Sequence, residues 1–185
     1  IERGEDRDVF KATMKKLGIP VPRSEIAESV EQAEAIAQKI GYPVVIRPAY
    51  TMGGTGGGIA YNMEELRTIA LRGLTVSIAK QILIEEAVVG WEELELEVVR
   101  DAKNQKITVC FIENIDAMGV HTGDSFCAAP MLTVSRELQK KLEEYSYRIV
   151  DAIGVVGGTN VQFAHNKKDG RVVVIEINPR TSRSS

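Results

Sequence analysis

Apolar residues recur at helical spacing in several parts of the chain. Val9 and Met14 belong to one such stripe, which stops at Gly18, a residue type that commonly ends a helix. Two further stripes begin just after Ser29 and Asn62, whose side chains suit the N-cap position. The pattern predicts helices over residues 5–18, 29–41, 62–73 and 136–153.

β-Branched runs bounded by turn signals lie between these helices. They cover residues 43–49, 58–61, 81–86, 93–100, 106–115, 159–165 and 171–177. The Lys-Lys-Asp-Gly sequence between the last two runs predicts a hairpin turn. Consecutive hairpin-like strands, with helices segregated from them, predict an α+β fold with mainly antiparallel sheets.

Composition indicates a globular protein without a polyanionic partner. The 185 residues are 44% hydrophobic, enough to bury a core in one domain or two small lobes. Lys and Arg number 23 against 26 Asp and Glu, with no long block of either sign, so we expect no nucleic acid and no membrane as partner. Cys110 and Cys127 lack the spacing of metal ligands. The sequence shows neither a span of roughly 20 apolar residues nor a signal-peptide pattern. We therefore expect a cytoplasmic protein with reduced thiols.

Five glycines fall within residues 53–58, between two predicted strands. Glycines permit positive φ and leave backbone N–H groups able to approach phosphate oxygens closely. The run is not a Walker loop, because no Gly-Lys-Ser/Thr follows and no helix opens from it. Arg47, at the end of the preceding strand, adds a fixed cation that suits a phosphate. Taken alone, a flexible hairpin and a surface arginine explain these residues equally well.

The segment VVVIEINPR, residues 172–180, carries polar residues at strand spacing. Glu176, Asn178 and Arg180 start on one face of the predicted strand, although Pro179 indicates that the strand is ending. Gln162 lies in the facing predicted strand and can stand across from them. Carboxylate and amide oxygens suit Mg²⁺, which takes few protein ligands and completes its shell with phosphates and water. The alternative is a solvated strand end.

Acidic residues cluster around the Gly-Trp turn of LIEEAVVGWEELELEVVRD, residues 83–101. Glu86 and Glu93 flank the turn, where a carboxylate can accept from a ribose hydroxyl or an adenine amino group. We assign Glu85, Glu92 and Glu95 to a solvated face.

His121 lies in a long segment rich in Asp, Gly, Ser and Pro, residues 113–130. Loops of this length in compact domains are either functional or disordered. A single loop histidine is most often a solvent-exposed side chain, so by itself it does not establish chemistry.

Several of these motifs together resemble one known family. VVIRPAYTMGGTGGGIAYN, EEAVVGWEELELEVVRD, IENIDAMGVHTGDS, GGTNVQFAHN and VIEINPRTSRSS are similar, in this order, to the ATP-grasp module of the carbamoyl-phosphate synthetase large subunit. The resemblance runs from about residue 5 to the end of the chain. TMGGTGGG and MGVHTGDS resemble the amino-terminal half of that subunit, the half that forms carboxyphosphate.

The resemblance implies an ATP-grasp fold, in which two lobes clasp ATP, and an ATP-dependent carbon–nitrogen ligase. The implied reaction is phosphorylation of bicarbonate by Mg-ATP to carboxyphosphate, which ammonia converts to carbamate on the way to carbamoyl phosphate for arginine and pyrimidine biosynthesis. A glutaminase small subunit would deliver the ammonia, and Mn²⁺ would be able to replace Mg²⁺.

The resemblance also implies roles for individual residues. Nucleotide and phosphate contacts are expected at Arg7, Arg47, Gly53, Gly54, Glu86, Glu93, His121, Gln162 and Glu176. The metal ligands are expected at Gln162, Glu176 and Asn178. The groups nearest the reacting atoms are expected to be His121, Asn178 and Arg180, with Arg180 at the bicarbonate end.

The implied organisation is a leading helix (residues 1–18), a small lobe with the glycine lid (19–88) and a larger lobe with the metal site (89–185). We expect the chain to be an excised piece of a longer enzyme, inactive alone in the overall reaction. Two alternatives remain: a nucleotide-binding module without turnover, and another ATP-grasp enzyme such as a biotin carboxylase or a D-alanine ligase. The MGVHTGDS segment argues against the second.

Overall fold

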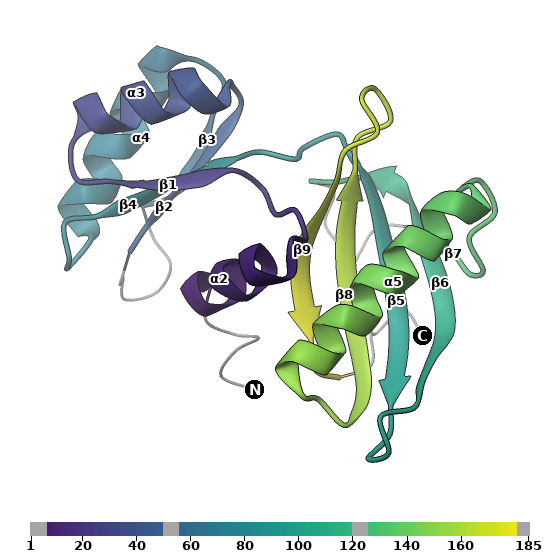
Figure 1. Ribbon diagram of the computed structural model, residues 1–185. Helices are drawn as coiled ribbons and strands as arrows, with labels where there is room; N and C mark the ends of the chain where they lie inside the picture. The colour runs from purple at the N-terminus through teal and green to yellow at the C-terminus, as the bar shows by residue number, and fades with distance from the viewer. Residues whose placement is uncertain (1–6, 50–55, 120–125, 181–185) are drawn as a thin grey trace. The chain divides into compact units, whose positions relative to one another are not determined.

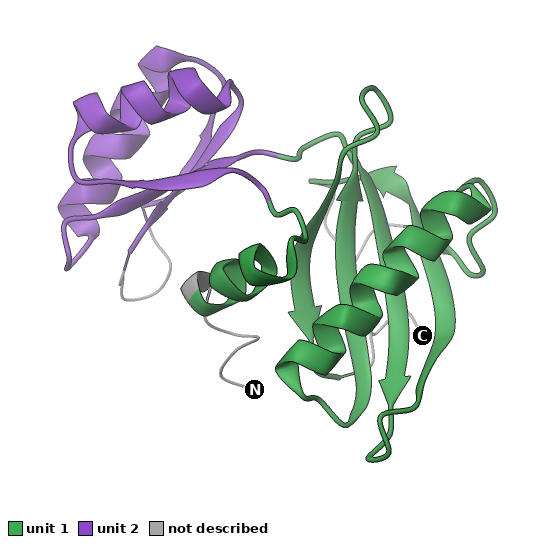
Figure 2. Cartoon of the chain, viewed as in Figure 1, with its two compact units in different colours: residues 1–21, 88–185 green, residues 22–87 purple. Residues whose placement is uncertain are grey.

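The computed structural model describes residues 7–49, 56–119 and 126–180, with side chains from residue 9 onward. The chain divides into two compact units, which Figure 2 shows in different colours. Unit 1 combines residues 1–21 with residues 88–185, and unit 2 consists of residues 22–87. Helix α2, expected from the sequence to be a separate leading helix, thus groups with the larger sheet.

Unit 2 is a four-stranded antiparallel sheet with two helices, in the strand order β1-β4-β2-β3 (Figure 1). Its elements are β1 (Ser24–Ala27), α3 (Val30–Ile40), β2 (Val44–Pro48), β3 (Gly58–Ala60), α4 (Met63–Val76) and β4 (Ile82–Glu86). Ile46 and Ile84 are register partners and are fully buried in a core shared with both helices. Because strand residues alternate between faces, Val45 and Arg47 lie on the opposite face of the sheet.

Both predicted N-caps of unit 2 are confirmed. The Ser29 side chain accepts from the backbone N–H of Gln32, and the Asn62 side chain accepts from that of Glu65. Helix α3 ends at Gly41, whose φ of 92° is in the region that favours glycine. The contacts of Ser29 and Asn62 satisfy backbone N–H groups that the first turn of each helix leaves unpaired.

Unit 1 is a five-stranded antiparallel sheet in the order β7-β6-β5-β8-β9. Its elements are α2 (Arg7–Leu17), β5 (Glu92–Arg100), β6 (Lys106–Ala117), β7 (Cys127–Ala128), α5 (Arg136–Ile153), β8 (Gly157–His165) and β9 (Val172–Asn178). Two antiparallel sheets with segregated helices confirm the predicted α+β class.

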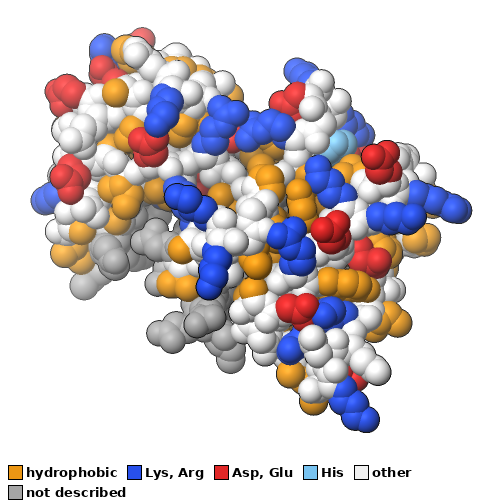
Figure 3. Space-filling model, in the orientation of Figure 1, with side chains coloured by type: hydrophobic (Ala, Val, Ile, Leu, Met, Phe, Trp, Pro, Cys, Tyr) orange, Lys and Arg blue, Asp and Glu red, His pale blue; other side chains and the backbone are white. Residues whose placement is uncertain are grey.

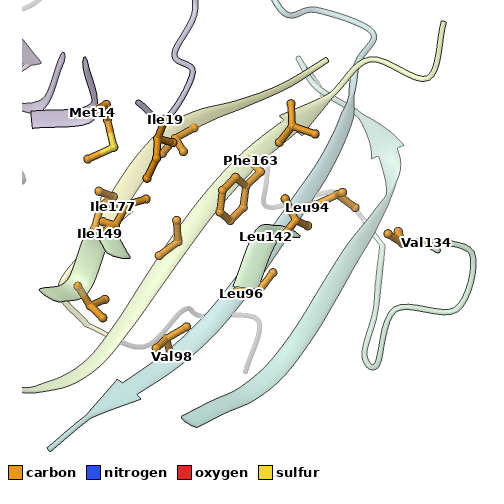
Figure 4. Close-up of a cluster of buried hydrophobic side chains, with 14 of the residues drawn as sticks. Met14, Ile19, Leu94, Leu96, Val98, Val134, Leu142, Ile149, Phe163 and Ile177 are labelled. Atoms are coloured by element: carbon orange, nitrogen blue, oxygen red, sulfur yellow. The ribbon is translucent and has the colours of Figure 1, made fainter. Parts of the chain in front are cut away.

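The core of unit 1 lies between its sheet and α5. Phe163, Leu94 and Leu96 from the sheet pack with Leu142 from the helix, and all four are fully buried (Figure 4). Met14 of α2 joins the same cluster. The α5 side of the sheet is therefore the hydrophobic side, and the other side can carry polar residues.

Two short strands are absent from the sequence prediction. Strand β1 pairs with β4, more than fifty residues further along the chain, and β7 is a two-residue strand on the edge of β6. None of the helices in the described ranges has the length and apolar character to cross a membrane. Figure 3 shows both acidic and basic side chains on the face in view.

Candidate functional site

The candidate site of unit 1 is the sheet face that points away from α5. The strand registers join Glu95 to Gln162 and Gln162 to Glu176 across β5, β8 and β9. Residues paired across an antiparallel ladder share a face, as do alternate residues of one strand. We call this surface the polar face, and its residues are Glu93, Glu95, Glu97, Asn160, Gln162, Glu176 and Asn178.

The three predicted metal ligands lie together on the polar face. Gln162 stands directly opposite Glu176, as the sequence suggests, and Asn178 lies two residues beyond Glu176, opposite Asn160. Glu176 is exposed, whereas Gln162 and Asn178 are half-buried. A β-bulge next to Gln162 shifts the register at this point. The set offers carboxylate and amide oxygens from adjacent strands, a donor chemistry that fits Mg²⁺.

Arg180 lies two residues beyond the end of β9 and is exposed. Its backbone N–H donates to the carbonyl of Asn178 at 2.7 Å, and its own carbonyl accepts from the backbone N–H of Asn160 at 3.2 Å. The chain after β9 is thus held against β8, close to the predicted metal ligands. Within the described ranges, no group of three or more His, Cys, Asp or Glu side chains is arranged as a metal site, so a metal here would depend on the amides as well.

The buried acids of β5 correct one sequence prediction. The sequence predicts that Glu95 lies on a solvated face, and this prediction is wrong: Glu95 is only 4% exposed, and Glu97 is buried beside it. Burial raises the pKa of the Glu93 carboxyl, and the charge of Glu95 raises that pKa further. The Glu-Leu alternation of residues 93–97 was the available signal, because it places these acids on one face.

Asn160 connects these acids, and sequence reasoning missed it. It is 1% exposed, and its Nδ2 donates to Glu95 Oε2 and to Glu97 Oε1, each at 2.8 Å. Asn114 of β6 donates to the second oxygen of Glu95 at 3.2 Å. The contact spans β6, β5 and β8, so only the strand order of the folded sheet reveals it.

In unit 2 the structure keeps Arg47 and Glu86 apart. Glu86 is the partner of Val44, on the helix side of the sheet, whereas Arg47 lies on the opposite side. Arg47 instead lies 3.6 Å from the carboxylate of Glu85, which is 20% exposed and was predicted to be solvated. Glu86 accepts from the backbone N–H of Arg23 at 3.2 Å.

Part of the glycine run has a packing role. Gly56 has a φ of 93°, and a Cβ there would lie 2.5 Å from Val76 Cγ2. A Cβ on Gly57 would lie 2.8 Å from the carbonyl oxygen of Ile46. Close approach of backbone to β2 and α4 therefore requires glycine at these positions.

Other predicted site residues lie outside the described residues. They are Gly53, Gly54 and His121, together with the side chain of Arg7, whose backbone begins α2.

The chain matches the family model described as "Carbamoyl-phosphate synthase L chain, ATP binding domain" over residues 6–185. It is 55% identical to the carbamoyl phosphate synthase large chain of Archaeoglobus fulgidus and to the N-terminal section of that chain from Methanopyrus kandleri, over 100% of its own length. It spans 17% of the first relative and 33% of the second.

Solved structures with the same fold include a biotin carboxylase from Campylobacter jejuni, with a TM-score of 0.74 and 20% identity over 98% of this chain and 42% of that one. The biotin carboxylase domain of a Hydrogenobacter thermophilus carboxylase, solved with MgADP and bicarbonate, has a TM-score of 0.77 and 24% identity over 98% and 41%. D-alanyl-alanine synthetase A of Vibrio cholerae has a TM-score of 0.75 and 14% identity over 96% and 56%. At these identities the likeness is one of fold, and the fold is ATP-grasp, as expected.

Proposed function

Because the chain belongs to the family of carbamoyl-phosphate synthase large-chain ATP-binding domains, we propose that it binds Mg-ATP and phosphorylates bicarbonate as part of such an enzyme. The product would be carboxyphosphate, which ammonia converts to carbamate on the way to carbamoyl phosphate. The whole protein would then be an ATP-dependent carbon–nitrogen ligase of arginine and pyrimidine biosynthesis. Similarity to the N-terminal section of a relative supports the carboxyphosphate-forming half.

The observation that carries this proposal is the juxtaposition of Gln162, Glu176 and Asn178 on two adjacent strands. Phosphoryl transfer depends on positioning and on neutralising charge more than on covalent help from the protein. Gln162, Glu176 and Asn178 would hold a divalent cation, which would supply positive charge to offset the charge that develops during transfer.

The other predicted site residues would bind the bicarbonate and the parts of the nucleotide. Arg180, two residues beyond the end of β9, would hold the bicarbonate anion through its fixed positive charge. In unit 1, Glu93 would accept from the ribose. In unit 2, Glu86 would accept from the adenine, and Arg47 would contact phosphate.

The residues outside the described ranges keep their proposed roles. Gly53 and Gly54 would close over the phosphates and exclude water, Arg7 would contact nucleotide, and His121 would lie near the transferred phosphoryl group. A glutaminase small subunit would supply ammonia, Mn²⁺ would substitute for Mg²⁺, and the enzyme would work in the cytoplasm.

A nucleotide-binding module without turnover is the second candidate, because the chain spans a minor part of each of its large-chain relatives. A biotin carboxylase function is less well supported, since the identity to those structures is 20–24%, against 55% to the synthase large chains.

Calorimetric titration of the chain with Mg-ATP tests the metal assignment. We expect Mg²⁺-dependent binding in the parent and its loss in Glu176→Ala. Glu144→Ala, an exposed residue of α5, is the matched control and should bind as the parent does. Bicarbonate-dependent release of phosphate would then distinguish a catalytic unit from a binding module. Mg²⁺-dependent binding that survives in Glu176→Ala would refute the metal assignment.

A further inference from the structure

The buried contact between Glu95 and Asn160 lies next to the proposed metal ligands without containing one. Glu95 is the register partner of Gln162, and Asn160 is the register partner of Asn178. The backbone N–H of Asn160 also donates to the carbonyl of Arg180. Asn160 therefore contacts the chain on both sides of its own strand: β5 through its side chain and the end of β9 through its backbone.

Glu95 has a fixed position because it is held from two strands. Its Oε2 accepts from Asn160 of β8 at 2.8 Å, and its Oε1 accepts from Asn114 of β6 at 3.2 Å. Both oxygens of this buried carboxylate are engaged, which holds the side chain between β6 and β8. The charge lies on the same face as Gln162 and Glu176.

The geometry points to Glu95 as a positioning residue for the metal-ligand set, an inference that rests on the proposed function. Glu95 would act through Asn160 and through its pairing with Gln162, without touching metal or nucleotide. It would fix the orientation of the amide ligands and add a negative charge that favours a divalent cation. Partners of this kind behind metal ligands typically contribute about 10- to 100-fold in metal affinity.

The test is a Mg²⁺ titration of the chain in the presence of ADP, with Glu95→Gln as the main variant. Glutamine keeps the size of the side chain and one acceptor oxygen but removes the charge. We expect the Mg²⁺ concentration for half-maximal ADP binding to rise about 10- to 100-fold. ADP affinity without metal should be unchanged, and excess Mg²⁺ should restore full binding.

Two further variants separate positioning from general damage. Asn114 is half-buried, and Asn114→Ala removes one hydrogen bond to Glu95. We expect the Mg²⁺ requirement to rise in this variant too, but by less than in Glu95→Gln. Thr159→Val is the matched control, because Thr159 is fully buried on the same strand as Asn160 and its hydroxyl has no hydrogen-bond partner among the described residues. It should leave the Mg²⁺ requirement at the parent value.

The outcomes distinguish this inference from the proposed function. If Glu176→Ala abolishes Mg²⁺ dependence but Glu95→Gln leaves it unchanged, only the positioning role is overturned. A Glu95→Gln variant that loses metal-free ADP binding to the same extent also overturns it, because the effect would then be structural. If the parent chain itself shows no Mg²⁺-dependent binding, the assignment of a metal site to this chain is refuted, and the positioning role with it.

Discussion

Glu113 anchors the segment before α5 to the sheet of unit 1, and its replacement by glutamine should destabilise that unit. The carboxylate is 6% exposed and accepts from the backbone N–H of Leu132 at 3.0 Å. It also accepts from the backbone N–H of Thr133 at 3.2 Å and from the Thr133 hydroxyl at 2.8 Å. These donors converge on both oxygens of one side chain.

Glutamine can accept at only one of its two terminal atoms. In Glu113→Gln the new NH₂ group would face the donors that the second carboxylate oxygen now satisfies. Loss of a charge-assisted hydrogen bond, which leaves a buried donor without an acceptor, lowers the free energy of unfolding by about 1–3 kcal/mol. For a chain of 150–250 residues, each kcal/mol lowers the melting temperature by about 2–4 °C.

Trp91 makes the assay specific, because it is the single tryptophan of the chain and lies in unit 1. Urea unfolding followed by its fluorescence therefore reports on the unit that contains Glu113. Glu144→Gln is the control, since Glu144 is an exposed residue of α5. Equal unfolding free energies for the two variants at neutral pH would refute the anchoring role.

The pH dependence provides a second test. Burial by itself would raise the pKa of Glu113, but the hydrogen bonds from Thr133 and Leu132 and the charge of Lys167 bring the pKa below its ordinary value of 4.5. A lowered pKa means that the ionised group stabilises the fold above pH 4.5 and that this contribution is lost as the pH falls through the folded-state pKa. The difference between parent and Glu113→Gln should therefore shrink in acid, and a difference that grows would contradict the assignment.

Two more predictions concern glycine packing and the polar face. Gly56→Ala should destabilise unit 2 by more than Gly41→Ala in thermal unfolding. The two glycines have φ values of 93° and 92°, so each substitution carries the strain of positive φ, about 1–3 kcal/mol, but only a Cβ on Gly56 would lie 2.5 Å from Val76 Cγ2. Equal losses of stability in the two variants would refute the clash. Glu93→Gln should raise the unfolding free energy at neutral pH, because burial and the charge of Glu95 raise the pKa of Glu93 and its ionised form opposes folding there. That gain should vanish below the ordinary pKa of 4.5, and a loss of stability at neutral pH would contradict it.

Local signals predicted most of the fold. Ser29 and Asn62 cap their helices because a short polar side chain satisfies N–H groups within the same turn, and this needs no tertiary information. Strand β1, Ser24–Ala27, was missed because its pairing partner β4 is far away in the sequence. A four-residue strand with a polar start carries too little alternation to be recognised without that partner.

The difference between local signals and long-range pairing also explains which contacts of the candidate site could be predicted. The facing positions of Gln162 and Glu176 could be predicted, because a short turn joins their strands into a hairpin. Asn160 and Glu95 could not be paired in this way, since α5 and two further strands separate them along the chain. Their contact depends on β8 lying next to β5, which only the tertiary fold determines.

The two faces of the unit 1 sheet contribute differently to stability. On the α5 side, Phe163 and Leu142 are fully buried and supply apolar contact that stabilises the fold. On the polar face, Glu95 and Glu97 are buried as neighbours that share one amide donor from Asn160, an arrangement in which desolvation and like charge oppose folding. Local rules are expected to be broken mainly where function requires it. Glu93→Gln should therefore weaken nucleotide binding without the loss of stability expected at Glu113, because the pKa of Glu93 is raised and that of Glu113 is lowered. The two kinds of carboxylate can be told apart by measuring both quantities on each variant.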